Sequence, residues 1–278
     1  MNVLSLFDGI SCGQLALNRA GISYDVYYAS EIKAEAIKIA QKNFPNTIHI
    51  GAVETVKGNE LNSIDLLIGG SPCQGFSTSG KRLQFNDPRS KLFFEYVRLL
   101  NECKPKYFLL ENVPMHKANQ NVITNILGVE PLQINSSLVS AQIRKRLYWT
   151  NIPVDSPPAD KGITFASIME SNPNPKYNLS QKAIHKVLHA PWAKKRFYGA
   201  HTPKVGTLPA GYGSIPTEGC YIDDGVNKRK ITPLEAERLQ TLPDGYTDCV
   251  CDTQRYHGIG NGWTVDIIAH IFKGLSKP

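Results

Sequence analysis

The sequence is poor in cysteine and has no long apolar run. Its 278 residues include only six cysteines, scattered along the chain: Cys12, Cys73, Cys103, Cys220, Cys249 and Cys251. This usage indicates reduced thiols rather than a disulfide framework. Only Cys249 and Cys251 are close enough for half a metal site, and no second half follows, so no metal is expected. No stretch approaches the ~18 consecutive apolar residues of a membrane span. The N-terminus MNVLSLFDGIS lacks the basic region and cleavage site of a leader. We therefore expect a cytoplasmic protein without membrane contact.

The composition is that of a folded protein, with 41% hydrophobic and 20% charged residues. The net charge of +7 permits a nucleic-acid partner, and residues 151–204 hold 8 basic against 3 acidic side chains. Aromatic and histidine side chains are interleaved with these charges between positions 182 and 198, a mixture that suits phosphate contacts and base stacking. A solvated basic helix is the alternative interpretation.

The first 150 residues alternate short apolar runs with stretches of helical period, which predicts an α/β fold with a parallel sheet covered by helices. The predicted strands cover residues 3–7, 24–30, 48–50, 64–68, 107–110, 132–139 and 146–150. Repeated prolines after Asn151 indicate a domain boundary. Thr232, Pro233 and Glu235 predict a capping box and a helix to about Gln240.

Ligands of open parallel sheets bind beyond the carboxyl ends of the strands, so the residues that follow each strand are candidates for a site. The first strand runs into FDGISCG, a tight turn whose exposed N–H groups can meet a negative group. Glu31 follows the second strand, where such folds hold a ribose, although it could equally cap the next helix.

Cys73 is the strongest single candidate for a catalytic residue, because it follows Gly-Gly-Ser-Pro at a strand end and begins a loop. A thiol held in that place suits nucleophilic attack, whereas a buried structural cysteine is the ordinary alternative. Glu111 ends a neighbouring strand and could give or hold a proton on a heterocycle. Arg144 and Arg146 lie two apart on a predicted strand, which suits contacts to a carbonyl or phosphate; a surface charge cluster is the alternative.

Together these segments resemble the DNA (cytosine-5) methyltransferase family over nearly the whole chain. The ordered series is LFDGISCG, a Glu after the second strand, GGSPCQGFS, DPRS before LFFEYVRLL, LLENV, QIRKR, ITPLEAERLQTLPDGYT and GNGWTV. Several segments look closest to the de novo branch of the animal enzymes, and the short chain suggests a minimal prokaryotic or phage-type unit. The resemblance implies a Rossmann-like, S-adenosylmethionine-dependent fold with a mostly parallel twisted sheet and a small target-recognition domain. It implies a catalytic domain over 1–150, target recognition over 151–228 and a C-terminal segment, 229–278, that returns to the catalytic domain.

The resemblance also implies roles for individual residues. Cys73 would attack C6 of a cytosine flipped out of duplex DNA, Glu111 would hold its N3 edge, and Arg146, together with Arg144, would hold the carbonyl or a phosphate. The residues implied in S-adenosylmethionine binding are Phe7, Asp8, Gly9, Ile10, Ser11, Gly13, Glu31, Ile32, Ala52, Val53, Ser71, Pro72, Asn261 and Trp263. The DNA contacts implied are Gln74, Ser77, Arg82, Arg89, Lys194, Lys195 and Arg196.

Two positions depart from the family pattern. Ala52 stands where the family usually has an Asp that binds the adenine amino group, and Ser11 and Cys12 stand where many members have glycines. Two other functions stay open: an RNA methyltransferase, against which Ser71 and residues 151–204 argue, and a catalytically silent DNA-binding homologue, suggested by Ala52. We expect a monomer that binds duplex DNA, with a cognate restriction enzyme as a further candidate partner.

Overall fold

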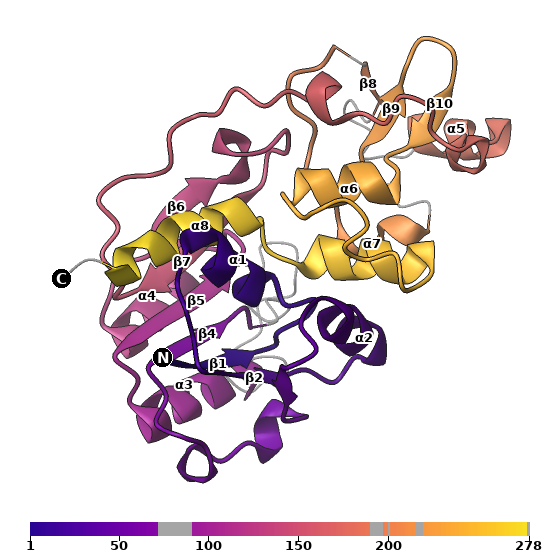
Figure 1. The fold of residues 1–278 in the computed structure, drawn as a ribbon. Coiled ribbons are helices and arrows are strands. Elements are labelled where there is room, and N and C mark those ends of the chain that lie inside the picture. Colours follow the sequence, from indigo (N-terminus) through magenta and orange to yellow (C-terminus); the bar gives the residue numbers. More distant parts are fainter. Residues whose placement is uncertain (72–90, 190–196, 200, 215–218, 277–278) are drawn as a thin grey trace. The chain divides into compact units, whose positions relative to one another are not determined.

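A computed structural model describes residues 1–71, 91–189, 197–199, 201–214 and 219–276 of the chain (Figure 1). The chain divides into two compact units. The first unit comprises Met1–Ile134, Lys145–Pro157 and Ile268–Pro278, and the second comprises Asn135–Arg144 and Pro158–Ile267.

The first unit contains a seven-stranded sheet in the order β3-β2-β1-β4-β5-β7-β6. Its strands are β1 (Asn2–Leu6), β2 (Val26–Ser30), β3 (Ile48–His49), β4 (Leu66–Gly69), β5 (Tyr107–Asn112), β6 (Leu132–Asn135) and β7 (Lys145–Thr150). The first five pair in parallel, while β5 and β7 are antiparallel. The strand order reverses between β1 and β4, and a parallel sheet opens a ligand crevice at such a point. The prediction of a mostly parallel α/β sheet is confirmed.

Helices cover both faces of this sheet. They are α1 (Cys12–Ala20), α2 (Ala34–Asn43), α3 (Lys91–Cys103), α4 (Lys117–Leu127) and the C-terminal α8 (Val265–Phe272). Leu4 and Leu6 of β1 share one buried cluster with Phe93 of α3 and Ile123 of α4, so these two helices pack on one face. Val3 points to the other face because strand side chains alternate, and α1 and α8 lie on that side (Figure 1). Strands β1 and β4 are therefore buried on both faces, which explains their continuous apolar runs, whereas Ile48 of β3 is 45% exposed.

The second unit has a small sheet of its own, in the order β10-β9-β8. Its elements are α5 (Gln181–Leu188), β8 (Phe197–Gly199), β9 (Tyr221–Asp223), β10 (Lys228–Lys230), α6 (Pro233–Leu239) and α7 (Asp252–Asn261). Strands β9 and β10 are antiparallel, and β8 and β9 are parallel. The second unit also contains the short 3₁₀ turns η3 (Ser136–Leu138), η4 (Ala166–Ile168), η5 (Pro175–Tyr177) and η6 (Ala210–Gly213), whereas η1 (Val53–Thr55), η2 (Gly58–Glu60) and η7 (Lys273–Ser276) belong to the first unit.

The capping box expected at the start of α6 is present. The Glu235 N–H donates to Thr232 Oγ1 at 3.2 Å, and the Thr232 N–H donates to Glu235 Oε2 at 2.9 Å. Glu235 also receives Arg229 Nη2 at 2.8 Å, and both side chains are buried. This pair links β10 to α6, so residues 229–267 fold within the second unit. The residues from Ile268 onward belong to the first unit.

None of the helices in the described ranges is long and apolar enough to cross a membrane. Within the same ranges, His, Cys, Asp and Glu side chains form no group of three that could hold a metal ion.

Candidate active site at the carboxyl ends of the strands

The turn between β1 and α1 is wound in unusual backbone conformations. Phe7, Gly9 and Ser11 have φ angles of 57°, 60° and 61°, all in the left-handed region. Glycine adopts this region freely, whereas a side chain there costs roughly 1–2 kcal/mol. The turn is held by the Asp8 N–H, which donates to the Ser30 carbonyl at 3.0 Å, and by the Ser11 N–H, which donates to the Asp8 carbonyl at 3.1 Å. Ser11 therefore adopts a backbone conformation that glycine takes more readily.

Asp8 presents a buried carboxylate inside this turn. Its Oδ1 accepts from Ser5 Oγ at 2.6 Å and from the Tyr27 hydroxyl at 2.8 Å. Its Oδ2 is buried and has no hydrogen-bond partner among the described residues. Burial raises the pKa of Asp8 to about 6, against the smaller lowering by these hydrogen bonds. A buried carboxylate oxygen without a partner can accept from a cationic ligand group.

Glu31 is fixed at the end of β2 by backbone donors. Its Oε1 accepts from the N–H groups of Ile32 at 2.8 Å and Lys33 at 2.9 Å, and its Oε2 accepts from the Gly9 N–H at 2.9 Å. The carboxylate therefore fixes the turn that precedes α2 and connects it to the turn that follows β1. Ile32 beside it is 72% exposed, a large apolar side chain left in contact with solvent. An exposed apolar residue next to a fixed carboxylate suits a ligand with a flat ring and hydroxyl groups.

Ala52 and Val53 follow β3 on the same edge of the sheet. Ser30 Oγ donates to the Gly51 carbonyl at 2.9 Å, which holds this loop against the end of β2. Val53 is buried in the core cluster, while Ala52 is partly exposed. The methyl group of Ala52 leaves this position without a polar side chain.

The end of β4 is closely packed. A Cβ on Gly69 would lie 3.0 Å from the Tyr96 ring and 3.2 Å from the Leu6 carbonyl, so these neighbours would have to shift to admit a larger residue. Ser71, which follows, is buried, and Asn112 Nδ2 lies 3.4 Å from both its carbonyl and its Oγ. The segment that leads to Cys73 therefore leaves the sheet from a fixed position.

Glu111 and Arg146 form an ion pair at the same edge. Glu111 is on β5 and Arg146 on the antiparallel β7, and Arg146 Nε lies 2.9 Å from Glu111 Oε1. Their side chains are only 12% and 13% exposed. Both charged groups are largely desolvated and keep a small contact with solvent. The guanidinium can donate a hydrogen bond to a heterocycle while the carboxylate accepts one from it.

Arg144 lies in the second unit, and its guanidinium is buried. Nη2 donates to the carbonyls of Gly260 at 3.0 Å and Gly262 at 3.1 Å, and Nη1 lies 3.4 Å from the Leu208 carbonyl. These bonds fasten the end of α7. The expected role of Arg144 at a base or phosphate stays a prediction.

The other predicted cofactor residues are divided between the two units. Ile10 is buried, and Gly13 lies in the first turn of α1. Asn261 ends α7 and contacts His257 at 3.2 Å, and Trp263 follows it, nearly buried, in the second unit.

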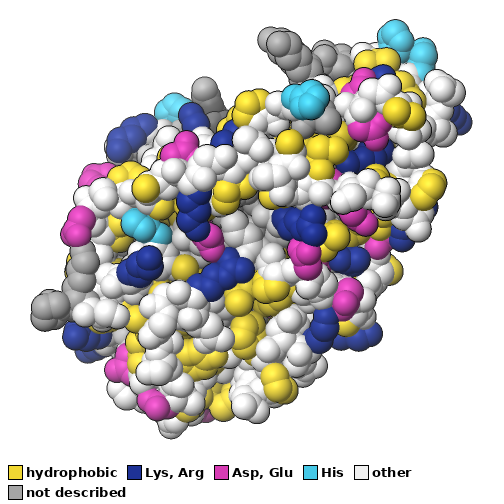
Figure 2. Space-filling view, turned by 45° about the horizontal axis from the view of Figure 1, so that its top comes forward, with side chains coloured by type: hydrophobic (Ala, Val, Ile, Leu, Met, Phe, Trp, Pro, Cys, Tyr) yellow, Lys and Arg dark blue, Asp and Glu magenta, His cyan; other side chains and the backbone are white. Residues whose placement is uncertain are grey.

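Several predicted residues lie outside the described ranges. These are Pro72, the nucleophile candidate Cys73, and all seven DNA-contact candidates: Gln74, Ser77, Arg82, Arg89, Lys194, Lys195 and Arg196. On the face shown in Figure 2, the described Lys and Arg side chains are interspersed with Asp and Glu rather than gathered in one block.

Comparison with known proteins assigns the chain to a family. The family model of the C-5 cytosine-specific DNA methylases matches residues 1–188 and 159–277. The chain belongs to this family.

Two curated relatives support the assignment. The chain is 31% identical over 296 residues to the Type II methyltransferase M1.ScrFI of Lactococcus lactis subsp. cremoris, with 96% of this chain and 75% of the relative covered. It is 31% identical over 294 residues to the Type II methyltransferase M.NlaX of Neisseria lactamica, with coverage of 97% and 94%. The solved structure of the Entamoeba histolytica methyltransferase EhMeth has the same fold, with a TM-score of 0.83, 20% identity and coverage of 100% and 99%. The chain is accordingly a DNA cytosine-5 methyltransferase.

Sequence reasoning missed the partners of Asp8 in this methylase. Ser5 and Tyr27 lie on β1 and β2, and their hydroxyls donate hydrogen bonds to the carboxylate. One feature of the sequence indicates such a contact: a serine lies inside the otherwise apolar strand VLSLF, and a buried hydroxyl needs a hydrogen-bond partner.

Proposed function

We propose that this methylase transfers the methyl group of S-adenosylmethionine to C5 of a cytosine in duplex DNA, at a short specific sequence. The observation that carries the proposal is the Glu111–Arg146 pair, 2.9 Å apart at the carboxyl edge of the sheet. A cytosine ring offers N3 and the exocyclic amine beside its O2 carbonyl, and a carboxyl group next to a guanidinium complements that edge.

The residues around the β1–α1 turn suit the methyl donor, which when bound supplies an electrophilic methyl group. The unpartnered Asp8 Oδ2 would accept from its ammonium group. Glu31, fixed by three backbone N–H groups, would accept from the ribose hydroxyls, and the exposed Ile32 would cover the adenine. Phe7, Val53 and the other described cofactor candidates of the first unit would complete this site.

Cys73 would begin the reaction on the base. Its thiolate would add to C6 with formation of a carbon–sulfur bond, and the ring electrons would shift to C5, which would then take the methyl group and leave S-adenosylhomocysteine as the second product. Glu111 would hold N3 during this step, and Arg146 would hold the carbonyl while negative charge builds on the ring. Removal of the C5 proton, for which water is a candidate base, returns the electrons, and the carbon–sulfur bond breaks to release Cys73.

This chemistry requires the cytosine to leave the helix, because C6 is shielded inside a stacked duplex. The second unit, together with the basic residues 194–196, would recognise the target and hold the flipped state. We propose that the protein acts as a monomer in the cytoplasm of a prokaryotic cell or a phage-infected host, with a cognate restriction enzyme as a candidate partner.

A labelled methyl-transfer assay tests the proposal on duplex DNA and on tRNA. We expect transfer to DNA, none with Cys73→Ala, and a rate lowered by about 10²- to 10⁴-fold with Glu111→Gln, which keeps the shape but removes the charge. Cys103→Ala, on α3, is the matched control and should keep full activity. Retained activity in Cys73→Ala would overturn the nucleophile, and transfer to tRNA alone would overturn the DNA substrate. Bisulfite sequencing of DNA from expressing cells then reads the target sequence.

A further inference from the structure

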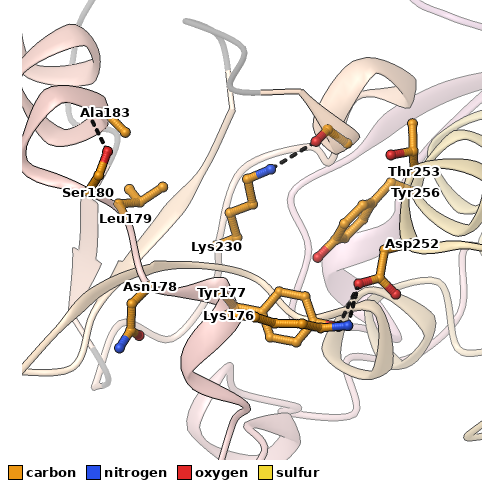
Figure 3. A pocket seen from close by; sticks show the side chains of 11 residues that line it. Lys176, Tyr177, Asn178, Leu179, Ser180, Ala183, Lys230, Asp252, Thr253 and Tyr256 are labelled. Carbon is orange, nitrogen blue, oxygen red and sulfur yellow. Dashed lines mark hydrogen bonds and ion pairs between the residues drawn. The ribbon is translucent and has the colours of Figure 1, made fainter.

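The second unit contains a cavity of about 410 Å³ that the proposed methyl transfer does not use (Figure 3). Three elements of the second unit contribute its polar and aromatic lining: η5 supplies Lys176 and Tyr177, β10 supplies Lys230, and α7 supplies Asp252 and Tyr256. The segment from Asn178 to Ala183 and residues Gly213 and Thr253 complete the wall. Pockets of this size, about 300–1,000 Å³, are those that hold small organic ligands.

Lys230 brings an ammonium group without an ion-pair partner among the described residues. Its Nζ donates one hydrogen bond, to the Gly213 carbonyl at 2.9 Å. Burial lowers the pKa of Lys230, and the Asp252 carboxylate partly offsets this effect. An ammonium has three hydrogens, so this group can donate further bonds to a ligand.

The described residues donate hydrogen bonds to only one of the two oxygens of the Asp252 carboxylate. Its Oδ2 accepts from Lys176 Nζ at 2.8 Å and from the Tyr177 hydroxyl at 3.0 Å, as the dashed lines of Figure 3 show. Its Oδ1 lies 3.9 Å from Arg255 Nη1, which is too far for a hydrogen bond. Burial opposes ionisation, but the bonds from Lys176 and Tyr177 outweigh it and hold the pKa of Asp252 below its ordinary value. The group is therefore an acceptor at neutral pH.

Two tyrosines give the cavity flat walls. Lys176 Nζ lies 4.9 Å from the centroid of the Tyr177 ring, a cation–π contact that holds this ring in place. Tyr256 is buried, and its hydroxyl donates to the Ile231 carbonyl at 2.7 Å, so its ring is also fixed. Rigid aromatic faces beside polar groups favour a planar heterocycle.

We propose that this cavity is a nucleobase site that takes guanine, with Lys230 donating to O6 or N7 and Asp252 accepting from N1–H and the exocyclic amine. Lysine contacts to O6 and N7 are among the commonest specific contacts to guanine. A phosphate alone would be repelled by Asp252, and among the bases guanine offers the ammonium two adjacent acceptors and the carboxylate two adjacent donors. The guanine belongs either to a free nucleotide or to an unpaired position in DNA.

Binding to the full chain, measured by calorimetry without the methyl donor, tests this site independently of methyl transfer. GMP should bind at least tenfold more tightly than AMP, CMP or TMP, and inorganic phosphate should not compete. IMP lacks the exocyclic amine and should bind several-fold more weakly than GMP. A duplex with one unpaired guanine and a fully paired duplex are then compared as competitors of GMP. Stronger competition by the unpaired duplex assigns the site to DNA, and equal competition by the two duplexes assigns it to the free nucleotide.

Two variants locate the binding. Lys230→Met should weaken GMP binding at least tenfold, whereas Lys228→Met, on the same strand but paired with Asp223 outside the cavity, should leave it within twofold. Asp252→Asn should remove the preference for GMP over IMP. Circular dichroism checks that each variant is folded. Equal affinity for all four nucleotides, no binding of either GMP or the unpaired duplex, or the same weakening in Lys230→Met and Lys228→Met would overturn the proposal.

Discussion

Among single residues, the candidate active site rests on charged groups that the sheet holds partly away from water. Asp8 receives two hydroxyl donors on one oxygen and none from the described residues on the other. Glu111 and Arg146 instead satisfy each other at 2.9 Å. The first arrangement is costly in the free protein, because a desolvated charge lacks compensation, whereas the second is balanced.

The raised pKa of Asp8 predicts a pH effect on stability. A carboxyl group whose pKa is about 6 when folded and 3.8 when unfolded stabilises the fold below pH 4, and this contribution is lost as pH rises through 6. The free energy of unfolding of the wild type, minus that of Asp8→Asn, should therefore fall by about 2 kcal/mol between pH 4 and pH 7. Urea unfolding across this range measures the difference. A flat difference for Asp8→Asn would contradict the assigned burial.

Position 52 predicts a gain in cofactor affinity. Ala52 is partly exposed at the edge where we place the adenine, and it offers no acceptor. Ala52→Asp should tighten S-adenosylmethionine binding about five- to tenfold, the value of roughly 1 kcal/mol from one added hydrogen bond. Calorimetry measures the dissociation constant. Thr55→Asp adds the same charge three residues later and serves as the control. An unchanged or weaker affinity for Ala52→Asp would count against the placement of the adenine.

Among helices and strands, close backbone contacts fix how each element meets its neighbours. Helix α7 packs so tightly on η6 that a Cβ on Gly260 would lie 2.5 Å from Ala210 Cα. The buried Arg144 guanidinium donates hydrogen bonds to the carbonyls of Gly260 and Gly262. Glycine is therefore required at Gly260, in the GNG segment, by packing within the second unit.

A matched pair of glycine substitutions tests this contact. Gly260→Ala should lower the free energy of unfolding by about 1–3 kcal/mol or more, since backbone of η6 would have to move. Gly211→Ala lies in η6 itself, where an added Cβ meets nothing within 4 Å, and should be nearly neutral. Urea denaturation compares the two variants. A destabilisation of similar size in both would show that η6 tolerates no added carbon and that the close approach at Gly260 is not the cause.

Across the molecule as a whole, the positive charge is unevenly spread along the chain. Residues 151–204 hold 8 basic and 3 acidic side chains, whereas residues 205–278 hold 7 and 9. Many described basic groups are already paired, as Lys176 is with Asp252 and Lys228 with Asp223. The sequence places three consecutive cations at Lys194, Lys195 and Arg196, and we propose these residues for phosphate contacts.

Salt dependence of DNA binding checks this assignment. Replacing Lys194, Lys195 and Arg196 together by alanine should weaken binding and reduce the slope of log K against log salt by about 0.9 for each phosphate that is no longer neutralised. Replacing Lys33, Lys38 and Lys42, in and next to α2, removes the same charge and should change the slope little. Fluorescence anisotropy at several salt concentrations measures both. Equal slopes for the two triple variants would assign the effect to net charge alone.

Local patterns were sufficient to predict much of this fold. Each predicted strand in the first 150 residues corresponds to an observed one within a few positions, because strands buried on both faces read as apolar runs. The capping box at Thr232 was predictable because it depends on residues three apart. Helix α7 was missed, since its sequence DTQRYHGIGN contains two internal glycines and only a weak apolar stripe.

Sequence patterns alone specify the alternating order of strands and helices, the strand-end motifs and the family to which they belong. The folded arrangement was needed to show that Arg146 pairs with Glu111, that Arg144 fastens α7, and that Lys230 and Asp252 line one cavity. The physical reason is distance along the chain. Periodicity and capping act between near neighbours, whereas these pairings join residues 22 to 116 positions apart, which are brought together by strand order and helix packing.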